Sequence, residues 1–130
     1  MPALGPENYS KFVLVGGISS RSRMQDTTSR CFTYESKNGI LKEVGAMSNS
    51  RHQFPLVYIQ TENNDAFCVM AIGGIQKIDK EVITLKSCAI FDPDLNSWVD
   101  APNLSEPRSN ATACQFQGKF VYLFGGFTKN

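Results

Sequence analysis

The sequence FCVMAIGG, residues 67–74, is a run of six apolar residues that ends in a glycine doublet. The same arrangement occurs twice more, as FVLVGG at residues 12–17 and as FVYLFGG at residues 120–126. The first glycines of the three doublets are therefore 57 and then 52 residues apart. A short apolar run bounded by glycine predicts a β-strand, and three such runs at nearly regular spacing predict a repeat protein.

The repeat extends beyond the doublets. Shifting the chain by 57 residues places Cys31 on Cys88, Tyr34 on Phe91, Leu41 on Trp98, Met47 on Leu104, Ser48 on Ser105 and Arg51 on Arg108. The five extra residues of the longer period fall in the polar stretch 60–65, where the next copy has a tight turn at Gln117 and Gly118. Surface loops accept such insertions at little cost, so the insertion does not break the repeat.

The local pattern predicts an all-β fold. Strands are expected at 11–15, 30–34, 40–44, 54–59, 67–72, 87–91, 97–100, 111–116 and 119–124, separated by glycine, proline, serine, asparagine and aspartate. A sustained apolar period of 3.6 residues is missing from the sequence, so we expect little or no helix. Several strands are apolar at nearly every position, as strands buried on both faces of stacked sheets are.

Four strands per period of about 50 residues, with a glycine doublet in each, are typical of a propeller blade. The sequence resembles the kelch repeat family over about residues 11 to 127. The resemblance is carried by the doublets, by Phe91-Asp92-Pro93, by Trp98, by Ala101-Pro102-Asn103-Leu104 and by Arg108. The first copy departs from this pattern at the positions of the tryptophan (Leu41), the Asp-Pro pair (Glu35-Ser36) and the Pro-Asn pair (Gly45-Ala46).

The resemblance implies a kelch-type β-propeller of four-stranded antiparallel meanders that is incomplete. In the family, strand A follows the arginine, strand B runs into the doublet, strand C ends at the aromatic residue and strand D carries the tryptophan. The expected divisions are an N-terminal extension (1–10), a partial blade with strands B–D (11–47), a complete blade (51–104), a partial blade with strands A and B (108–127) and a tail (128–130).

Closed propellers have about four to eight blades, so two and a quarter blades cannot close a ring. Three explanations stay open. The chain is a fragment or truncated product, it closes by assembling with copies of itself, or it completes the ring of another chain. We favour the fragment, because full propeller chains have about 200–350 residues at this repeat length.

Composition excludes several classes of protein. The 130 residues carry a formal net charge of +1 without blocks of either sign, which argues against binding nucleic acid or a membrane through bulk charge. The sequence has no apolar segment of about 20 residues and no secretory signal at its start, so we expect a soluble, cytoplasmic protein. The four cysteines lack metal-ligand spacing and lie in strand-like runs, which predicts buried, reduced thiols and no metal.

The structural residues of the repeat are the six doublet glycines (Gly16, Gly17, Gly73, Gly74, Gly125 and Gly126) and the aromatic residues Tyr34, Phe91 and Trp98. Glycine permits a positive φ and removes the Cβ where one blade lies close to the next. Each aromatic side chain can bury about 150–250 Å² at the seam between blades. These residues are therefore expected to set the stacking of the sheets.

Candidate partner-binding residues lie at one end of the expected blades, where the D–A and B–C loops emerge. The resemblance implies that Arg51, His52, Arg108, Ser109 and Asn110 match positions that contact ligand in family members that bind acidic peptides. Arg21 and Arg23, in a long B–C loop, could add to this surface. Forked guanidinium donors suit carboxylates. The alternative is that a strand-start arginine only satisfies loop carbonyls, and that the arginine-rich loop is a solvated connection.

The predicted function is a non-enzymatic protein–protein interaction module whose partner is another protein, with an acidic peptide segment as the expected ligand. Self-association, or pairing with another chain, would cover the exposed blade edges. Members of the family serve as substrate adaptors for cullin-based ubiquitin ligases or as actin-binding scaffolds. The alternatives are an enzyme of the sugar-oxidising or isomerising type, and a truncated product without independent function. The sequence predicts no catalytic residue and no cofactor, because it lacks a nucleophile elbow, a phosphate-cradling loop and a histidine cluster.

Overall fold

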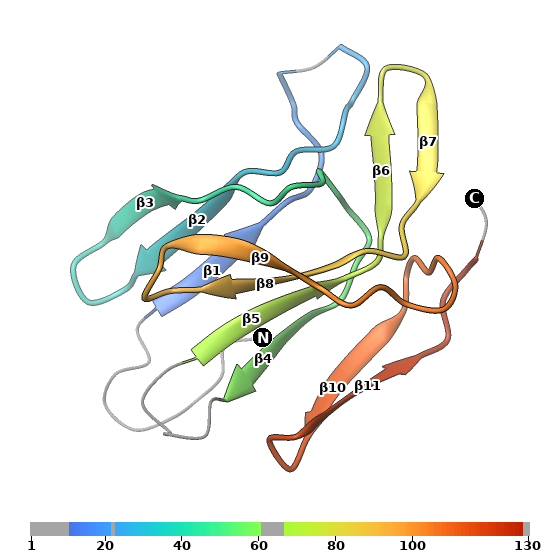
Figure 1. Cartoon of the computed structure of the whole chain (residues 1–130). Helices are drawn as coiled ribbons and strands as arrows, with labels where there is room; N and C mark the ends of the chain where they lie inside the picture. Colours follow the sequence, from blue (N-terminus) through green and yellow to red (C-terminus); the bar gives the residue numbers. More distant parts are fainter. Residues whose placement is uncertain (1–10, 22, 61–66, 129–130) are drawn as a thin grey trace.

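The computed structural model describes residues 11–21, 23–60 and 67–128, and these residues form three antiparallel sheets and one separate hairpin (Figure 1). The first sheet contains β1 (Lys11–Val15), β2 (Cys31–Glu35) and β3 (Ile40–Val44). The second contains β4 (Leu56–Gln60), β5 (Phe67–Ile72), β8 (Cys88–Asp92) and β9 (Ser97–Ala101), and the third contains β10 (Thr112–Phe116) and β11 (Phe120–Phe124). The described residues include no helix, and hence none that could cross a membrane.

Each of the nine expected strands has a counterpart within two residues of its predicted limits. The hairpin of β6 (Ile75–Ile78) and β7 (Glu81–Thr84) was not expected, because we predicted a loop there. The sequences IQKI and EVIT each hold two apolar and two polar residues that do not alternate, so neither shows the period of two that predicts a strand. Their turn, Asp79-Lys80, also lacks the glycine that usually marks a two-residue hairpin turn, and Asp79 itself takes the positive φ of 54°.

The repeat is visible in the main-chain hydrogen bonds. The Gly16 amide donates to the carbonyl oxygen of Arg30 at 3.0 Å, and 57 residues later the Gly73 amide donates to that of Ser87 at 3.0 Å. The first glycines of the three doublets have φ values of 63°, 59° and 65°. A Cβ added to Gly73 would lie 2.4 Å from the carbonyl oxygen of Arg108, which no side chain can tolerate. The doublets thus mark matching places in successive sheets.

Consecutive doublets are also linked to the following repeat. The Gly17 amide donates to the carbonyl oxygen of Arg51 at 2.8 Å, and the Gly74 amide donates to that of Arg108 at 2.8 Å. Both bonds run from the second glycine of a doublet in one sheet to the arginine that lies four or five residues before the first strand of the next sheet. Main-chain atoms therefore connect neighbouring sheets directly.

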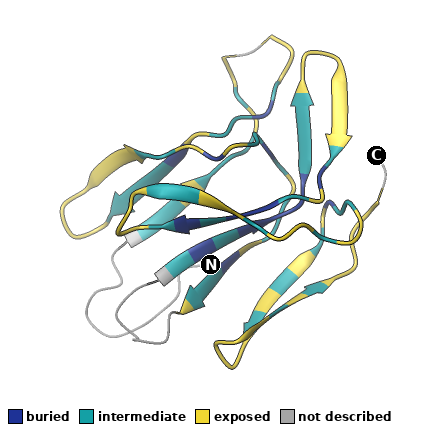
Figure 2. Cartoon of the chain, viewed as in Figure 1, coloured by how far each residue is buried: buried dark blue, intermediate teal, exposed yellow. Residues whose placement is uncertain are grey.

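The apolar core consists of two seams between neighbouring sheets. In the seam between the first and second sheets, Cys31 and Met47 pack with Ala71, and Val15 and Trp98 lie against them. In the seam between the second and third sheets the buried residues are Val57, Ile72 and Cys88, flanked by Val121, Leu123 and others. Figure 2 shows the buried positions concentrated on β5 and β8, because the middle sheet is covered on both faces.

The predicted aromatic residues take different positions relative to these seams. Phe91 is buried, and its ring centroid lies 5.4 Å from that of the half-buried Trp98. Tyr34 is half-buried and lies 6.1 Å from Phe12 on the first sheet. The described sheets do not close into a ring, so apolar side chains stay exposed at both ends of the stack, among them Leu14 on β1 and Phe116, Phe120, Tyr122 and Phe124 on β10–β11.

The predicted divisions at 11–47, 51–104 and 108–127 stay predictions. The N-terminal extension 1–10, most of the polar insertion (61–66) and the last two residues of the tail lie outside the described residues.

Candidate functional site

A groove opens at the end of the sheets where the D–A and B–C loops meet, and we call it the hairpin groove. It has a volume of about 460 Å³ and is lined by His52, Gln53, Ile75, Lys77, Val82, Ser109, Asn110 and Phe127. The structure thus brings together three of the predicted binding residues, namely His52, Ser109 and Asn110. It adds five residues that sequence reasoning did not select.

Two equivalent main-chain bridges build the groove. His52 and Ile75 exchange two amide-to-carbonyl hydrogen bonds of 2.9 Å, and Ser109 and Phe127 exchange two of 2.9 and 2.8 Å. The first bridge positions the β6–β7 hairpin, where Lys77 pairs with Val82 across the strands. The second positions Phe127, whose side chain is 64% exposed. The repeat itself therefore places one apolar residue beside each D–A loop.

Gln53 and Asn110 join these two bridges. The Asn110 amide donates to the carbonyl oxygen of Gln53 at 2.9 Å, and its Nδ2 donates to Gln53 Oε1 at 3.3 Å. Both residues are left-handed, with φ values of 53° and 54°, and they stand 57 residues apart in the repeat. A non-glycine residue in this region costs about 1 kcal/mol or more, and such strain is frequent at binding sites.

The chemistry of the groove is amphipathic. Ile75, Val82 and Phe127 supply apolar surface, while His52 and Asn110 supply hydrogen-bonding groups. Burial, and then the positive charge of Lys77, lower the pKa of His52, so its imidazole is uncharged at neutral pH. Such a surface suits an apolar side chain together with polar main-chain atoms better than it suits an isolated carboxylate.

The two strand-start arginines lie elsewhere. Arg51 is completely buried, and its guanidinium donates to the carbonyl oxygens of Gly73 and Ser87, both at 2.9 Å, and to Ser87 Oγ at 3.2 Å. Burial lowers its pKa, but a guanidinium remains charged at any physiological pH. Arg108 repeats the first contact by donating to the carbonyl oxygen of Gly125 at 3.1 Å. Both arginines thus satisfy loop carbonyls within their own sheets, as the alternative interpretation expects.

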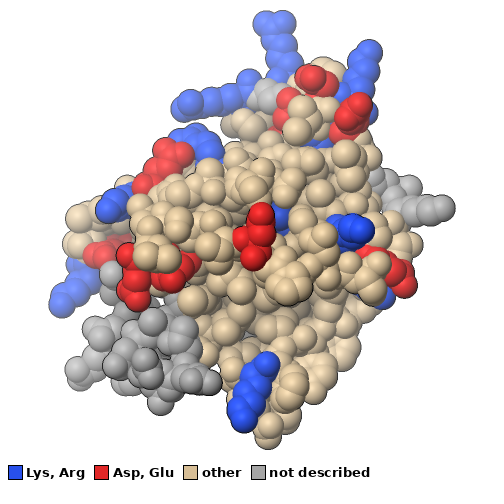
Figure 3. Space-filling model, in the orientation of Figure 1, with Lys and Arg blue, Asp and Glu red and all other residues tan. Residues whose placement is uncertain are grey.

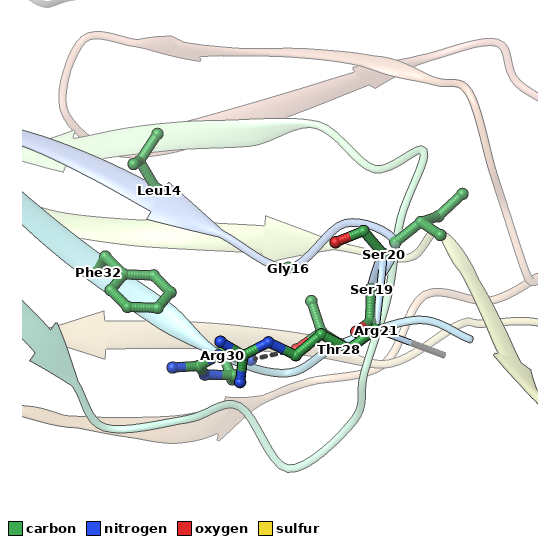
Figure 4. A pocket seen from close by; sticks show the side chains of 9 residues that line it. Leu14, Gly16, Ser19, Ser20, Arg21, Thr28, Arg30 and Phe32 are labelled. Atoms are coloured by element: carbon green, nitrogen blue, oxygen red, sulfur yellow. Dashed lines mark hydrogen bonds between the residues drawn. The ribbon is translucent and has the colours of Figure 1, made fainter. Parts of the chain in front are cut away.

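Arg21 and Arg23 also lie outside the groove. They belong to the loop between β1 and β2, which is held against the hairpin through Thr27 and Asp26. Arg21 lines a separate cavity of about 220 Å³ on the first sheet, together with Leu14, Gly16, Thr28, Arg30 and Phe32 (Figure 4). Figure 3 shows basic and acidic side chains mixed at the end of the molecule that carries this loop and the hairpin, whereas the surface over the middle sheet is largely uncharged.

Sequence reasoning missed Gln53, Ile75, Lys77, Val82 and Phe127. One signal was available: Phe127 stands two residues after Gly125, and Ile75 stands in the same place after Gly73. The sequence could not show which residue of the facing loop each apolar residue contacts, because that contact depends on how closely two sheets approach each other.

The comparisons with known proteins concern the repeat and the fold. No family model matches the sequence. Human gigaxonin is 28% identical over 65 residues, which make up 48% of this chain and 11% of gigaxonin. Human kelch repeat and BTB domain-containing protein 13 is 34% identical over 55 residues, which make up 42% of this chain and 11% of that protein. The chain therefore spans only about a tenth of the curated relatives it matches.

Two solved structures share the arrangement of sheets. A fungal alcohol oxidase of the AA5 family, in complex with copper, superposes with a TM-score of 0.70 over 90% of this chain and 25% of that one, at 18% identity. YjhT superposes with a TM-score of 0.71 over 93% of this chain and 32% of that one, also at 18% identity. The chain is a partial kelch-type propeller.

The predicted divisions give each sheet a place in the repeat. They would make β1–β3 strands B–D of one blade, β4, β5, β8 and β9 strands A–D of the next, and β10–β11 strands A and B of a third, and this assignment stays a prediction. The β6–β7 hairpin lies between β5 and β8, where that prediction has the second B–C loop. At 18% identity the likeness to the oxidase concerns the fold alone. In the described ranges, no group of three or more histidine, cysteine, aspartate or glutamate side chains comes together as metal ligands would.

Proposed function

We propose that this kelch-type propeller segment is a protein-interaction module whose hairpin groove binds an extended segment of a partner protein. The observation that carries the proposal is the groove itself, an amphipathic hollow formed where two successive repeats present their D–A and B–C loops. The matched relatives include a protein named for its kelch repeats, which supports a protein partner in general terms.

The groove specifies the chemistry of the segment. Ile75, Val82 and Phe127 would surround one apolar anchor side chain, which is where binding energy concentrates in small interfaces. The outer edge of β7 pairs with no other strand among the described residues, so it can accept main-chain hydrogen bonds from an extended peptide. Lys77 places a positive charge beside the hollow, which favours a carboxylate next to the anchor. The proposed ligand is thus still an acidic peptide segment, but one whose carboxylate stands next to an apolar anchor side chain.

A site-directed crosslink tests the proposal. A photoreactive phenylalanine analogue replaces Phe127, and in a control protein it replaces Phe116, an exposed aromatic residue of β10 outside the groove. We expect a partner segment that crosslinks to position 127 and not to position 116. Mass spectrometry of that adduct identifies the segment, and the identity of the partner then decides between a ligase substrate and a cytoskeletal protein.

The identified segment is next measured against point variants. Val82→Asp should weaken binding at least tenfold, because it places a charge in the apolar wall. Val99→Asp, at an exposed position of β9, is the matched control and should bind like the unchanged protein. Equal crosslinking at 116 and 127, or equal affinity of the Val82 and Val99 variants, would contradict the proposed site. The predicted cytoplasmic location stays a prediction.

A further inference from the structure

His52 has a fixed position in the wall of the hairpin groove. Its main chain exchanges two hydrogen bonds of 2.9 Å with Ile75, at the start of β6. Its side chain is half-buried and lines the groove together with Lys77. It is the only histidine among the 130 residues, and histidine is the side chain whose ordinary pKa lies between pH 5 and 8. The groove therefore contains a group that can change its charge near neutral pH.

The hairpin brings one positive charge to this histidine. Lys77 stands two residues after Ile75, so both side chains project from the same face of β6. The Lys77 ammonium donates to the Met24 carbonyl oxygen at 2.7 Å, which holds its charge in place. Glu81 pairs with Ile78, one residue beyond Lys77, so its carboxylate belongs to the opposite face of the hairpin.

The other charged groups around the groove are engaged elsewhere. Asp26 accepts a hydrogen bond of 2.8 Å from the Asp79 amide at the turn of the hairpin. Arg51 and Arg108 donate to the glycine carbonyl oxygens described above. Glu106 is exposed and does not line the groove. Among the described residues, the lining thus offers one ammonium, one imidazole and no carboxylate.

These surroundings make His52 sensitive to a bound carboxylate. Burial, and then the positive charge of Lys77, lower the pKa of His52 in the chain alone. A carboxylate beside both groups would raise that pKa, because an opposite charge favours the charged form of the imidazole. A glutamate has an ordinary pKa of about 4.3, so it stays ionised at pH 6. A pKa that rises on binding means that the complex takes up a proton.

We propose that the hairpin groove takes up a proton at His52 when it binds a segment that carries a carboxylate, so that its affinity for acidic segments increases as the pH falls. The inference rests on the function proposed above for this groove. The increase begins at the pKa of His52 in the complex and levels off below its pKa in the chain alone, where the imidazole is already charged. An acidic segment is therefore distinguished from its uncharged amide most strongly under mildly acidic conditions.

The probes are two peptides with blocked ends, TLTET and TETLT, and their glutamine versions TLTQT and TQTLT. Leucine is the anchor, and the residue two positions away projects from the same face of an extended segment, in either chain direction. NMR titration of the whole 130-residue chain gives the affinities at pH 6 and pH 8. The imidazole signals of the single histidine give the pKa of His52 with and without each peptide.

We expect the glutamate peptide of the preferred direction to raise the pKa of His52 and to bind at least fivefold more tightly at pH 6 than at pH 8. The matching glutamine peptide should do neither, because it carries no charge. An unchanged pKa, or equal affinity of the glutamate peptide at the two pH values, would overturn the inference and leave the groove as a binding site. Failure of all four peptides to bind at either pH would contradict the function proposed for the groove as well.

Two sets of variants assign the effect to these side chains. His52→Gln should abolish the difference between pH 6 and pH 8, and a difference that persists would place the proton on another group. Lys77→Gln should raise the pKa of His52 in the chain alone, because it removes the neighbouring positive charge. Lys119→Gln changes an exposed lysine outside the groove and should leave that pKa unchanged. Equal pKa values in the two lysine variants would show that Lys77 does not act on His52.

Discussion

At the scale of single residues, the two strand-start arginines show how burial decides the role of a charged side chain. Both donate to the carbonyl oxygen of the first glycine in the doublet that follows them. Arg51 is fully buried and also donates to the carbonyl and hydroxyl oxygens of Ser87, whereas Arg108 is half-buried. The surroundings differ accordingly: the Arg51 guanidinium lies 6.0 Å from the ring centroid of Phe54, whereas the contact of Arg108 with the Gly125 carbonyl is exposed.

This difference predicts unequal effects on stability. Arg51→Met should lower the free energy of unfolding by about 2–4 kcal/mol, because it removes the guanidinium donor to the buried Gly73 carbonyl and leaves the Ser87 carbonyl with the Gly73 amide alone. Arg108→Met should lower it by less than about 1 kcal/mol, because water can replace the lost contact. Urea unfolding followed by circular dichroism measures both. Equal shifts of the two midpoints would show that burial does not distinguish the arginines.

The sequence located part of the candidate site at this scale. It grouped His52, Ser109 and Asn110 because the repeat puts them at the same end of successive strands, and they do share one groove. It could not show that Arg51 turns inward, because an arginine at a strand start can reach solvent or a carbonyl. The choice depends on how closely the next sheet approaches, and that distance is a tertiary property.

At the scale of elements, the β6–β7 hairpin is the main difference between structure and expectation. Thr27 holds the β1–β2 loop against it. Its Oγ1 lies 2.7 Å from Ser50 Oγ and donates to the Lys77 carbonyl at 3.0 Å, and it also accepts from the Lys77 amide at 3.0 Å. The neighbouring B–C loops therefore form one supported wall beside the groove.

Removing this hydroxyl should loosen the loop and leave the sheets intact. Thr27→Val keeps the shape of the side chain but removes the acceptor of the Lys77 amide and the contact with Ser50 Oγ, while the Lys77 carbonyl keeps the hydrogen bond from the Thr27 amide. We expect native-state trypsin cleavage after Arg21 and Arg23 to become roughly tenfold faster, which corresponds to about 1.4 kcal/mol of local opening. Thr112→Val, at an exposed position of β10, is the control. Equal cleavage rates in the two variants would show that the Thr27 hydroxyl does not hold the β1–β2 loop in place.

At the scale of the whole molecule, the two seams make reactivity differ among the cysteines. Burial raises the pKa of Cys31 and Cys88, one in each seam. The pKa of Cys68 is raised by burial and then by the negative charges of Asp92 and Asp94. A raised pKa leaves less thiolate at a given pH, and burial also excludes the reagent.

Iodoacetamide at pH 8 should therefore label the exposed Cys114 first, Cys68 more slowly, and Cys31 and Cys88 only on unfolding. Because the middle sheet belongs to both seams, Cys31 and Cys88 should lose protection at the same urea concentration. Peptide mass mapping of the adducts follows each site. Early labelling of Cys31 alone would mean that the first sheet detaches independently.

The all-β class, the strands and the kelch-type stacking were predictable because each repeat carries its own local signals, namely apolar runs, turns and glycine doublets. The faces left open at the two ends were expected from the count of strands. Their chemistry was not, since Leu14 and Phe124 occupy positions whose equivalents, Ala71 and Ile72 in the middle repeat, are buried. Whether such a position is covered depends on its neighbours in space.

The bonds from Gly17 to Arg51 and from Gly74 to Arg108 have a consequence for how such a protein can change during evolution. Both link peptide groups, which every substitution other than proline at the donor leaves in place, so the spacing of the sheets does not depend on which side chains are present. Core positions are then free to drift in size together, as Val15 and Ile72 have done between one copy and the next. The fold can therefore be kept even when almost no sequence similarity between the repeats remains, provided that the glycine doublets are retained.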